Sequence, residues 1–146
     1  MMKKHFFKLL FAIVLVFAGA CSPTQDDEID FSEPEKDITG SWELNQVLRN
    51  GEDITSLVDF TQFRINFLED GTYNFENYIP FAVKEPGIFY LDDPQFAFQI
   101  NFQTSSETVP VEFTYPIVDG KRQLQLKLSP GCNQNKYVYT LNRIED

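Results

Sequence analysis

Cys21 is the residue whose sequence context most clearly indicates a chemical modification. A basic stretch at positions 1–5 is followed by an apolar run from Phe6 to Phe17, which only Lys8 interrupts, and then by Ala18-Gly19-Ala20. Basic, apolar and small residues in this order predict a signal peptide over residues 1–20. The apolar run is shorter than the about 20 residues that a membrane-spanning helix needs. Cleavage after the small residues leaves Cys21 at the start of the mature chain.

The same arrangement resembles the lipobox, the processing signal of bacterial lipoproteins. In that family the cysteine side chain is diacylated, the preceding peptide is removed and the new N-terminus is acylated. The resemblance implies that Cys21 carries a lipid such as palmitate, and that the membrane is a partner of the protein through this anchor. The alternative is an ordinary signal peptide that a cysteine follows by chance.

The mature chain offers little else for catalysis. Its only histidine, His5, lies in the predicted signal peptide, so no Ser-His or Cys-His pair can activate a nucleophile. The imidazole ligands that are usual in zinc and non-haem iron sites are also missing, and no glycine-rich phosphate loop is present. We therefore expect no enzymatic activity, no cofactor and no metal centre.

Adjacent carboxylates and one cysteine remain as candidates. Glu69-Asp70 and Asp92-Asp93 stand beside glycine or proline, where acidic side chains commonly form turns. Asp92-Asp93 is a weak candidate for Ca²⁺, and no spacing singles out a pair of carboxylates for glycoside hydrolysis. Cys132 has no partner within the chain if Cys21 is acylated, and its place in a turn favours a structural role over reactivity.

The charge of the chain limits its partners. The signal peptide holds three of the 12 basic residues and none of the 22 acidic residues, so residues 21–146 carry a formal net charge of −13. DNA, RNA and anionic lipid surfaces each require a basic face. We therefore expect no nucleic acid partner, and the simplest role of the acidity is to keep an exported domain soluble.

Residues 21–37 are expected to form an acidic tether that carries the lipid. From Ser22 to Asp37 the chain has seven acidic residues but only two large apolar residues, too few to offset the entropy of ordering, and like charges extend such a linker. Within it, Gln25-Asp26-Asp27-Glu28 resembles the export signal that follows the cysteine in surface-exposed lipoproteins of Bacteroidota. The alternative is a generic acidic tether.

From Ile38 onward, apolar and polar residues alternate with a period of two, which is typical of half-buried strands. Residues 53–60 do not alternate and are expected to form a short helical or irregular crossing, whereas Asp70-Gly71 is a strong hairpin signal. Eight strands are predicted: Trp42 to Leu48, Phe63 to Phe67, Tyr73 to Phe75, Ile88 to Leu91, Phe96 to Phe102, Val111 to Tyr115, Leu124 to Leu128 and Tyr137 to Arg143.

Strands joined by short turns are antiparallel neighbours. A sheet with one apolar face and no helix to cover it must fold on itself as a barrel or a sandwich, and closure also removes exposed edges. We therefore predict an all-β domain over residues 38–146. The mature chain has one Trp, six Tyr and eleven Phe, and these rings either fill the interior or line a pocket for one small ligand.

The stretch Thr39-Gly40-Ser41-Trp42 resembles the Gly-x-Trp signature of lipocalins. In that family the tryptophan closes the base of the barrel, and an arginine from the last strand lies over its ring. Arg143 lies in phase with Leu141 on the last predicted strand, and a cation over an indole face is favourable. The resemblance implies an eight-stranded antiparallel up-and-down lipocalin-like β-barrel that Trp42 and Arg143 close.

A longer pattern is similar to lipocalin-like lipoproteins of unknown function from Bacteroidota. It comprises Ile38–Trp42, Asn50–Thr55, Phe67–Tyr73, Gly120–Gln123 and Ser129–Cys132. That family implies the fold and a lipid anchor at the outer membrane, facing the cell surface, but no established activity. The expected function is binding of a small apolar or glycan-derived ligand without catalysis. The alternative is a structural or interaction module with a filled core that docks on another envelope protein.

Overall fold

The computed structural model describes residues 33–57, 59–60, 62–131 and 133–145. These residues belong to one structural unit that begins at Glu33. The predicted signal peptide, Cys21, the stretch Gln25-Asp26-Asp27-Glu28 and Cys132 lie outside the described residues. Every regular element within the described ranges is a β-strand, and no helix there is long and apolar enough to cross a bilayer.

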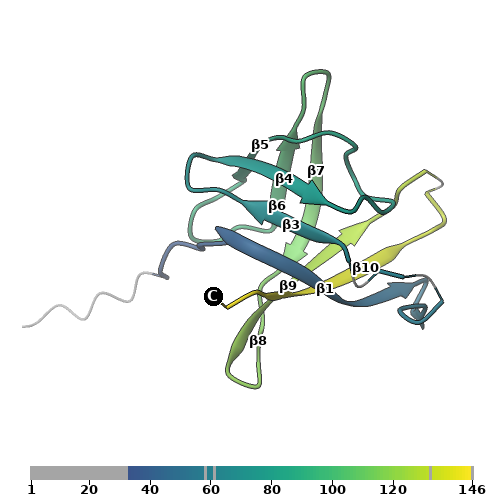
Figure 1. The fold of residues 1–146 in the computed structure, drawn as a ribbon. Helices are drawn as coiled ribbons and strands as arrows, with labels where there is room; N and C mark the ends of the chain where they lie inside the picture. Colours follow the sequence, from purple (N-terminus) through teal and green to yellow (C-terminus); the bar gives the residue numbers. More distant parts are fainter. Residues whose placement is uncertain (1–32, 58, 61, 132, 146) are drawn as a thin grey trace, which may run out of the picture. The chain divides into compact units, whose positions relative to one another are not determined.

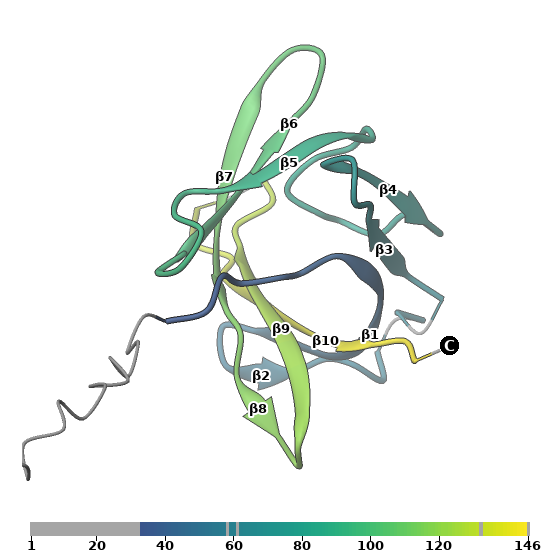
Figure 2. The same ribbon diagram turned by 90° about the vertical axis from the view of Figure 1, so that its left-hand side faces the viewer.

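Eight strands close into an antiparallel barrel, as predicted. They are β1 (Gly40–Arg49), β3 (Arg64–Phe67), β4 (Thr72–Glu76), β5 (Gly87–Leu91), β6 (Gln99–Gln103), β7 (Thr108–Thr114), β9 (Lys121–Leu128) and β10 (Tyr137–Arg143). Consecutive strands of the ring are paired, and β10 pairs with both β9 and β1. This last pairing closes the ring, and Figure 1 and Figure 2 show the first strand beside the last.

Two short strands lie outside the ring. β2 (Glu52–Asp53) folds back onto β1, and β8 (Ile117–Val118) pairs with the beginning of β9. The turns Asn50-Gly51 and Asp119-Gly120 connect these hairpins, and their four residues have φ values between 50° and 87°, as type I′ turns require. The β8–β9 hairpin projects from the ring (Figure 1).

The loop between β4 and β5 contributes an aromatic ring to the core. The segment between β4 and β5 turns inward over residues 79–83, where Phe81 is 4% exposed. The Phe81 ring lies 5.3 Å from that of Phe75 on β4 and 5.5 Å from that of Phe102 on β6. It also lies 6.4 Å from the ring of Tyr139 on β10, so it bridges opposite walls. We call residues 79–83 the plug, and the end that they close the plug end. Of the two alternatives for the interior, the structure favours the filled core.

Two tyrosine hydroxyls hold the segment that contains the plug. Tyr139 donates a hydrogen bond to the Pro80 carbonyl at 2.6 Å, and Tyr73 donates one to the Glu85 carbonyl at 2.9 Å. Burial raises the pKa of both phenols, that of Tyr73 to about 12. Both hydroxyls therefore stay protonated near neutral pH and keep this segment bonded to β4 and β10.

The other end of the barrel receives the N-terminal segment, and we call it the tether end. Residues 33–39 lead into β1 there, beside the loop at residues 92–98, the β8–β9 hairpin and the end of β10 (Figure 1). The Lys36 N–H donates to the Pro94 carbonyl, and the Tyr115 hydroxyl donates to the Asp37 carbonyl. Lys36 and Asp37, which the sequence assigns to the tether, thus contact the barrel.

Phe96 and Phe98 depart from the predicted alternation. The pattern puts them on the buried face of a strand, but they are 58% and 71% exposed. The strand begins only at Gln99, because the Asp92 and Asp93 carboxylates accept hydrogen bonds from backbone N–H groups of the residues before and at its start. This part of the strand prediction is wrong, since side-chain acceptors replace the ladder there.

Candidate functional site

Trp42 and Arg143, the two residues expected to close the barrel, lie side by side at the tether end. They are partners in the β1–β10 register, and the Arg143 guanidinium carbon lies 5.7 Å from the centroid of the Trp42 ring. Trp42 is fully buried, and its Nε1–H donates to the Ile38 carbonyl at 2.8 Å. The Arg143 guanidinium also donates to the Thr39 carbonyl, so it joins the segment before β1 to the last strand.

Gly40 makes room for this arginine. Its φ is +115°, a conformation that other residues rarely adopt, and a Cβ added there lies 3.1 Å from Arg143 Nε. Both the backbone and the close approach of the guanidinium therefore favour glycine. The spacing of Gly40 and Trp42 thus has a physical cause, because one arginine packs over both positions.

The structure extends this pair with Tyr115 and Arg122. Tyr115 meets the Trp42 ring edge-on, with the centroids 6.0 Å apart. The Arg122 guanidinium carbon lies 5.0 Å from the centroid of the Tyr115 ring, and the guanidinium donates to the Tyr115 carbonyl. Burial raises the pKa of the Tyr115 hydroxyl. Sequence reasoning missed both residues, because only the β8–β9 hairpin brings them together.

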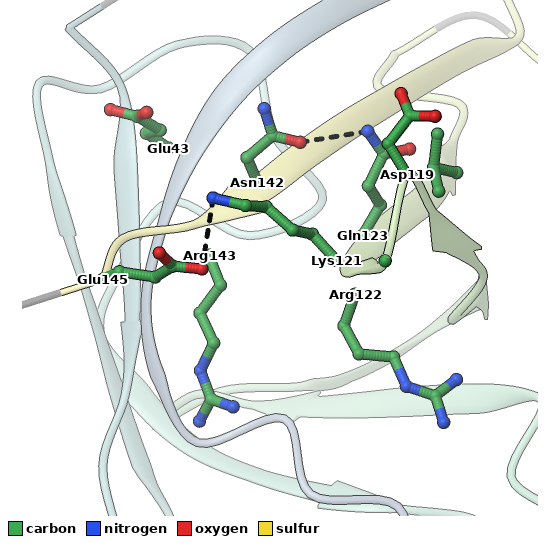
Figure 3. A pocket seen from close by; sticks show the side chains of 10 residues that line it. Glu43, Asp119, Lys121, Arg122, Gln123, Asn142, Arg143 and Glu145 are labelled. Carbon is green, nitrogen blue, oxygen red and sulfur yellow. Dashed lines mark hydrogen bonds and ion pairs between the residues drawn. The ribbon is translucent and has the colours of Figure 1, made fainter.

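A polar pocket of about 470 Å³ lies beside Arg143, between β1, β10 and the β8–β9 hairpin (Figure 3). Its three cations already have partners. Lys121 pairs with Glu145 at 3.2 Å, while Arg122 and Arg143 lie over the aromatic rings described above. Because these charges are engaged, we assign this pocket to the closure of the barrel and not to a ligand.

The acidic pairs singled out in the sequence form turns. Asp70 accepts hydrogen bonds from the backbone N–H and the hydroxyl of Thr72, and these bonds lower the pKa of its carboxyl. The backbone N–H groups of Gln99 and Phe98 lower the pKa of Asp92. Within the ranges that the structure describes, no group of three or more His, Cys, Asp or Glu could hold a metal ion.

The wall of the barrel is incompletely paired between β7 and β9. Only Glu112, Phe113 and Thr114 of β7 have partners on β9. The preceding part of β7, residues 108–111, pairs with β6 alone. The end of β9, around Leu128, pairs with β10 alone. We call the gap between these two segments the seam.

Proline explains why the pairing stops. Continuing the β7–β9 register sets Pro110 opposite Ser129, and Val109 opposite Pro130. The N–H of Phe113 bonds on the β6 side of β7, so by alternation the nitrogen of Pro110 faces β9. This nitrogen has no hydrogen to donate. The next ladder bond is therefore lost, and the strands separate.

Two clefts open along the seam. One of about 530 Å³ lies over β7, β9 and β10, and one of about 440 Å³ lies beside the plug. Pro110, Lys127, Leu128 and Ser129 line both clefts. The second cleft also reaches Phe81 of the plug. The seam thus places the exposed side chains of Pro110 and Tyr78 beside a break in the wall.

Three lysines surround the seam: Lys84, Lys127 and Lys136. Lys127 pairs with Glu112 at 3.4 Å, and both side chains are more than half exposed, so this ion pair is weak. Lys84 and Lys136 make no side-chain hydrogen bond or ion pair with any residue that the structure describes. The chain as a whole is acidic, but these lysines make the seam locally positive. Positive charge beside apolar surface favours binding of an anion at the seam.

Sequence reasoning did not find the seam. The sequence pattern assigns Pro110 to the loop before a strand and Pro130 to a turn, whereas β7 begins at Thr108 and includes Pro110. The available signal is a proline near the start of one strand and another just after the end of its partner. Recognising it requires the register of β7 against β9, which the sequence does not state.

Comparison with known proteins provides a family. No curated protein and no solved structure matches the chain. A family model described as a domain of unknown function, DUF5004, matches residues 19–142. The match includes Cys21 and all the barrel strands except the last residue of β10. Because it covers most of the sequence, the chain belongs to the DUF5004 family of domains of unknown function.

Proposed function

We propose that the protein is a lipid-anchored barrel of the outer membrane that binds a small amphipathic anion at the seam, without catalysis. The seam is the observation that supports this function, because it combines apolar surface with lysines that lack a partner among the described residues. An apolar or glycan-derived body with a carboxylate or phosphate matches both features. Since the core is filled, the ligand lies at the seam and not at the centre of the barrel.

The apolar part of the ligand packs on Pro110 and on the ring of Tyr78, which are both exposed beside the clefts. Each methylene group that it buries contributes about 0.8 kcal/mol, so the apolar part needs about ten buried carbons to approach micromolar affinity. Lys136 beside one cleft and Lys84 beside the other attract its charged group. Their contribution is smaller and depends on salt, because both lie at a surface that water reaches.

Removing the two lysines tests this site. The probe is 1-anilinonaphthalene-8-sulfonate, which joins aromatic rings to an anion. N-phenyl-1-naphthylamine has the same rings without the sulfonate. Lys84→Gln combined with Lys136→Gln should weaken binding of the sulfonate about 3- to 30-fold, as expected for the loss of two solvent-exposed ion pairs. Binding of the neutral probe should stay unchanged. Fluorescence titration measures both affinities.

Lys121→Gln is the matched control, because Lys121 lies in the polar pocket at the tether end. It should leave the affinity for both probes unchanged. Equal losses in the control and the seam variant, or no loss in either, contradict a site at the seam. Native mass spectrometry of the protein purified gently from its own cells then identifies its occupant. A retained small molecule supports the proposed function, whereas a retained protein supports the interaction module.

The proposed location rests on two stretches outside the described residues. The lipobox-like stretch ending at Cys21 supports an anchor in the outer membrane. The stretch Gln25-Asp26-Asp27-Glu28 supports transfer of the anchored protein to the cell surface. On this proposal the acidic residues act as a targeting signal, and they contribute nothing to folding of the barrel.

Replacing Asp26, Asp27 and Glu28 together by alanine should trap the protein on the inner side of the outer membrane. Protease added to intact cells should then degrade less of it, while total expression and membrane association stay the same. Replacing Glu33 and Glu35 by alanine is a control that removes acidity further along the tether. Unchanged accessibility of the triple variant would falsify the export signal and leave a simple tether.

A further inference from the structure

Exposed apolar side chains gather at the tether end of the barrel. Nine large apolar side chains are exposed among the described residues, and five of them lie on two loops and the β8–β9 hairpin of this end. They are Leu68, Phe96, Phe98, Ile117 and Val118. Phe98 is 71% exposed and Ile117 is 61% exposed, although both residue types are usually buried. Exposed apolar side chains that gather at one end of a protein are typical of an interaction site.

Hydrogen bonds place two of these loops on either side of the N-terminal segment. Lys36 bonds to the carbonyls of Pro94 and Gln95, in the loop that carries the two phenylalanines. Asp37 accepts a hydrogen bond from Tyr115, at the base of the hairpin that carries Ile117 and Val118. The chain that runs back toward Cys21 therefore leaves the barrel between the two apolar loops.

The length of the tether limits where this end can go. Eleven residues lie between Cys21 and Glu33, and the twelve Cα-to-Cα steps of this stretch reach about 40 Å when fully extended. An acyl group on Cys21 thus holds the tether end, more closely than the plug end, to the surface in which the lipid is inserted. The apolar loops are presented to that same surface.

We infer that the tether end rests on the bilayer that holds the lipid anchor, with Phe96, Phe98, Ile117 and Val118 in its interfacial region. This orientation rests on the anchor of the proposed function. The partner is the surface of neutral lipids, because the chain as a whole is too acidic to seek an anionic one. Insertion of these apolar side chains into the interfacial region adds to the membrane affinity that the lipid anchor provides.

The charges near the loops are compatible with such a surface. The Asp92 and Asp93 carboxylates each accept two hydrogen bonds from backbone N–H groups of their own loop, which offset part of their negative charge. At the hairpin turn, Asp119 and the ion pair of Lys121 with Glu145 are exposed, so these charges stay in water beside the lipid headgroups while the apolar side chains insert. The seam lies toward the plug end, so this orientation leaves its clefts facing away from the membrane.

Tryptophan placed on each end of the barrel tests the orientation. The lipidated full-length protein is reconstituted into vesicles of phosphatidylethanolamine and phosphatidylcholine, with or without brominated acyl chains that quench tryptophan. Phe98→Trp should show blue-shifted emission that the brominated lipid strongly quenches. Leu57→Trp is the matched control, since Leu57 is 74% exposed at the plug end. Its added emission should remain unquenched. Trp42 in the unmutated protein supplies the common background.

Flotation of the vesicles separates the possible failures. If Phe98→Trp protein floats with them, but its added emission is no more quenched than that of Leu57→Trp, it is anchored and points elsewhere, which overturns the orientation. Protein that does not float lacks the anchor, which overturns the proposed attachment and the orientation with it. Ile117→Trp, on the second loop, provides an independent reading if the first variant folds poorly, and it should be quenched as well.

Discussion

Trp42→Ala should destabilise the barrel by about 3–5 kcal/mol, the usual effect of truncating a large aromatic residue in a core. The indole is fully buried and bonded to the Ile38 carbonyl, so its loss leaves both a cavity and an unpaired acceptor. Urea unfolding followed by circular dichroism measures the change. Trp42→Phe keeps much of the volume and should cost less, which preserves a folded variant for measurement.

Arg143→Ala should cost about 0.5–2 kcal/mol, the range of a cation–π contact from exposed to desolvated sites. Combined with the Trp42 variant it should show coupling, because the two side chains touch. Arg49 lies on β1, at the opposite end from Trp42. The free-energy changes of Arg49→Ala and the Trp42 variant should therefore be additive. Additivity for Arg143 as well would refute an energetic role for the stacking.

Cys21→Ser should remove the protein from the membrane fraction. Serine lacks the thiol that the proposed lipid anchor requires, so acyl labelling should fall to background and the chain should behave as a soluble or uncleaved precursor. Cys132→Ser is the control, because it removes the other cysteine and should change neither labelling nor fractionation. Equal labelling of Cys21→Ser and the unmutated protein would show that Cys21 is an ordinary residue after a signal peptide.

The barrel is predictable from the sequence because its strands obey a period of two. The eight predicted strands correspond one to one with the strands of the ring. The β1–β10 contact of Trp42 and Arg143 could also be anticipated, since Gly40 and Trp42 form a short motif and Arg143 lies in phase on the last strand. Local pattern and family resemblance agree at these positions, so little depends on long-range packing.

The exposed phenylalanines, the plug and the seam could not be predicted, because each depends on contacts between residues that a local sequence pattern does not describe. Phe96 and Phe98 alternate as strand residues, but the Asp92 and Asp93 carboxylates capture their backbone N–H groups first. Phe81 lies in a segment that the sequence predicts as a loop, and it is buried only because the opposite walls of a closed ring stand within its reach. Pro110 matters through the strand it faces, and that neighbour is known only once the sheet is assembled.

The pairing of β1 with β10 has a consequence for how the chain reaches its folded state. A chain that emerges from its N-terminus presents β1 first, and one edge of β1 stays open until residues 137–143 arrive. Contacts between such distant segments form slowly, and an open edge recruits other strands meanwhile. Pairing of the C-terminal strand β10 with β1 therefore closes the barrel and removes the open edge at which other chains could aggregate. A truncation or a bulky fusion there leaves two open edges, one on β1 and one on β9.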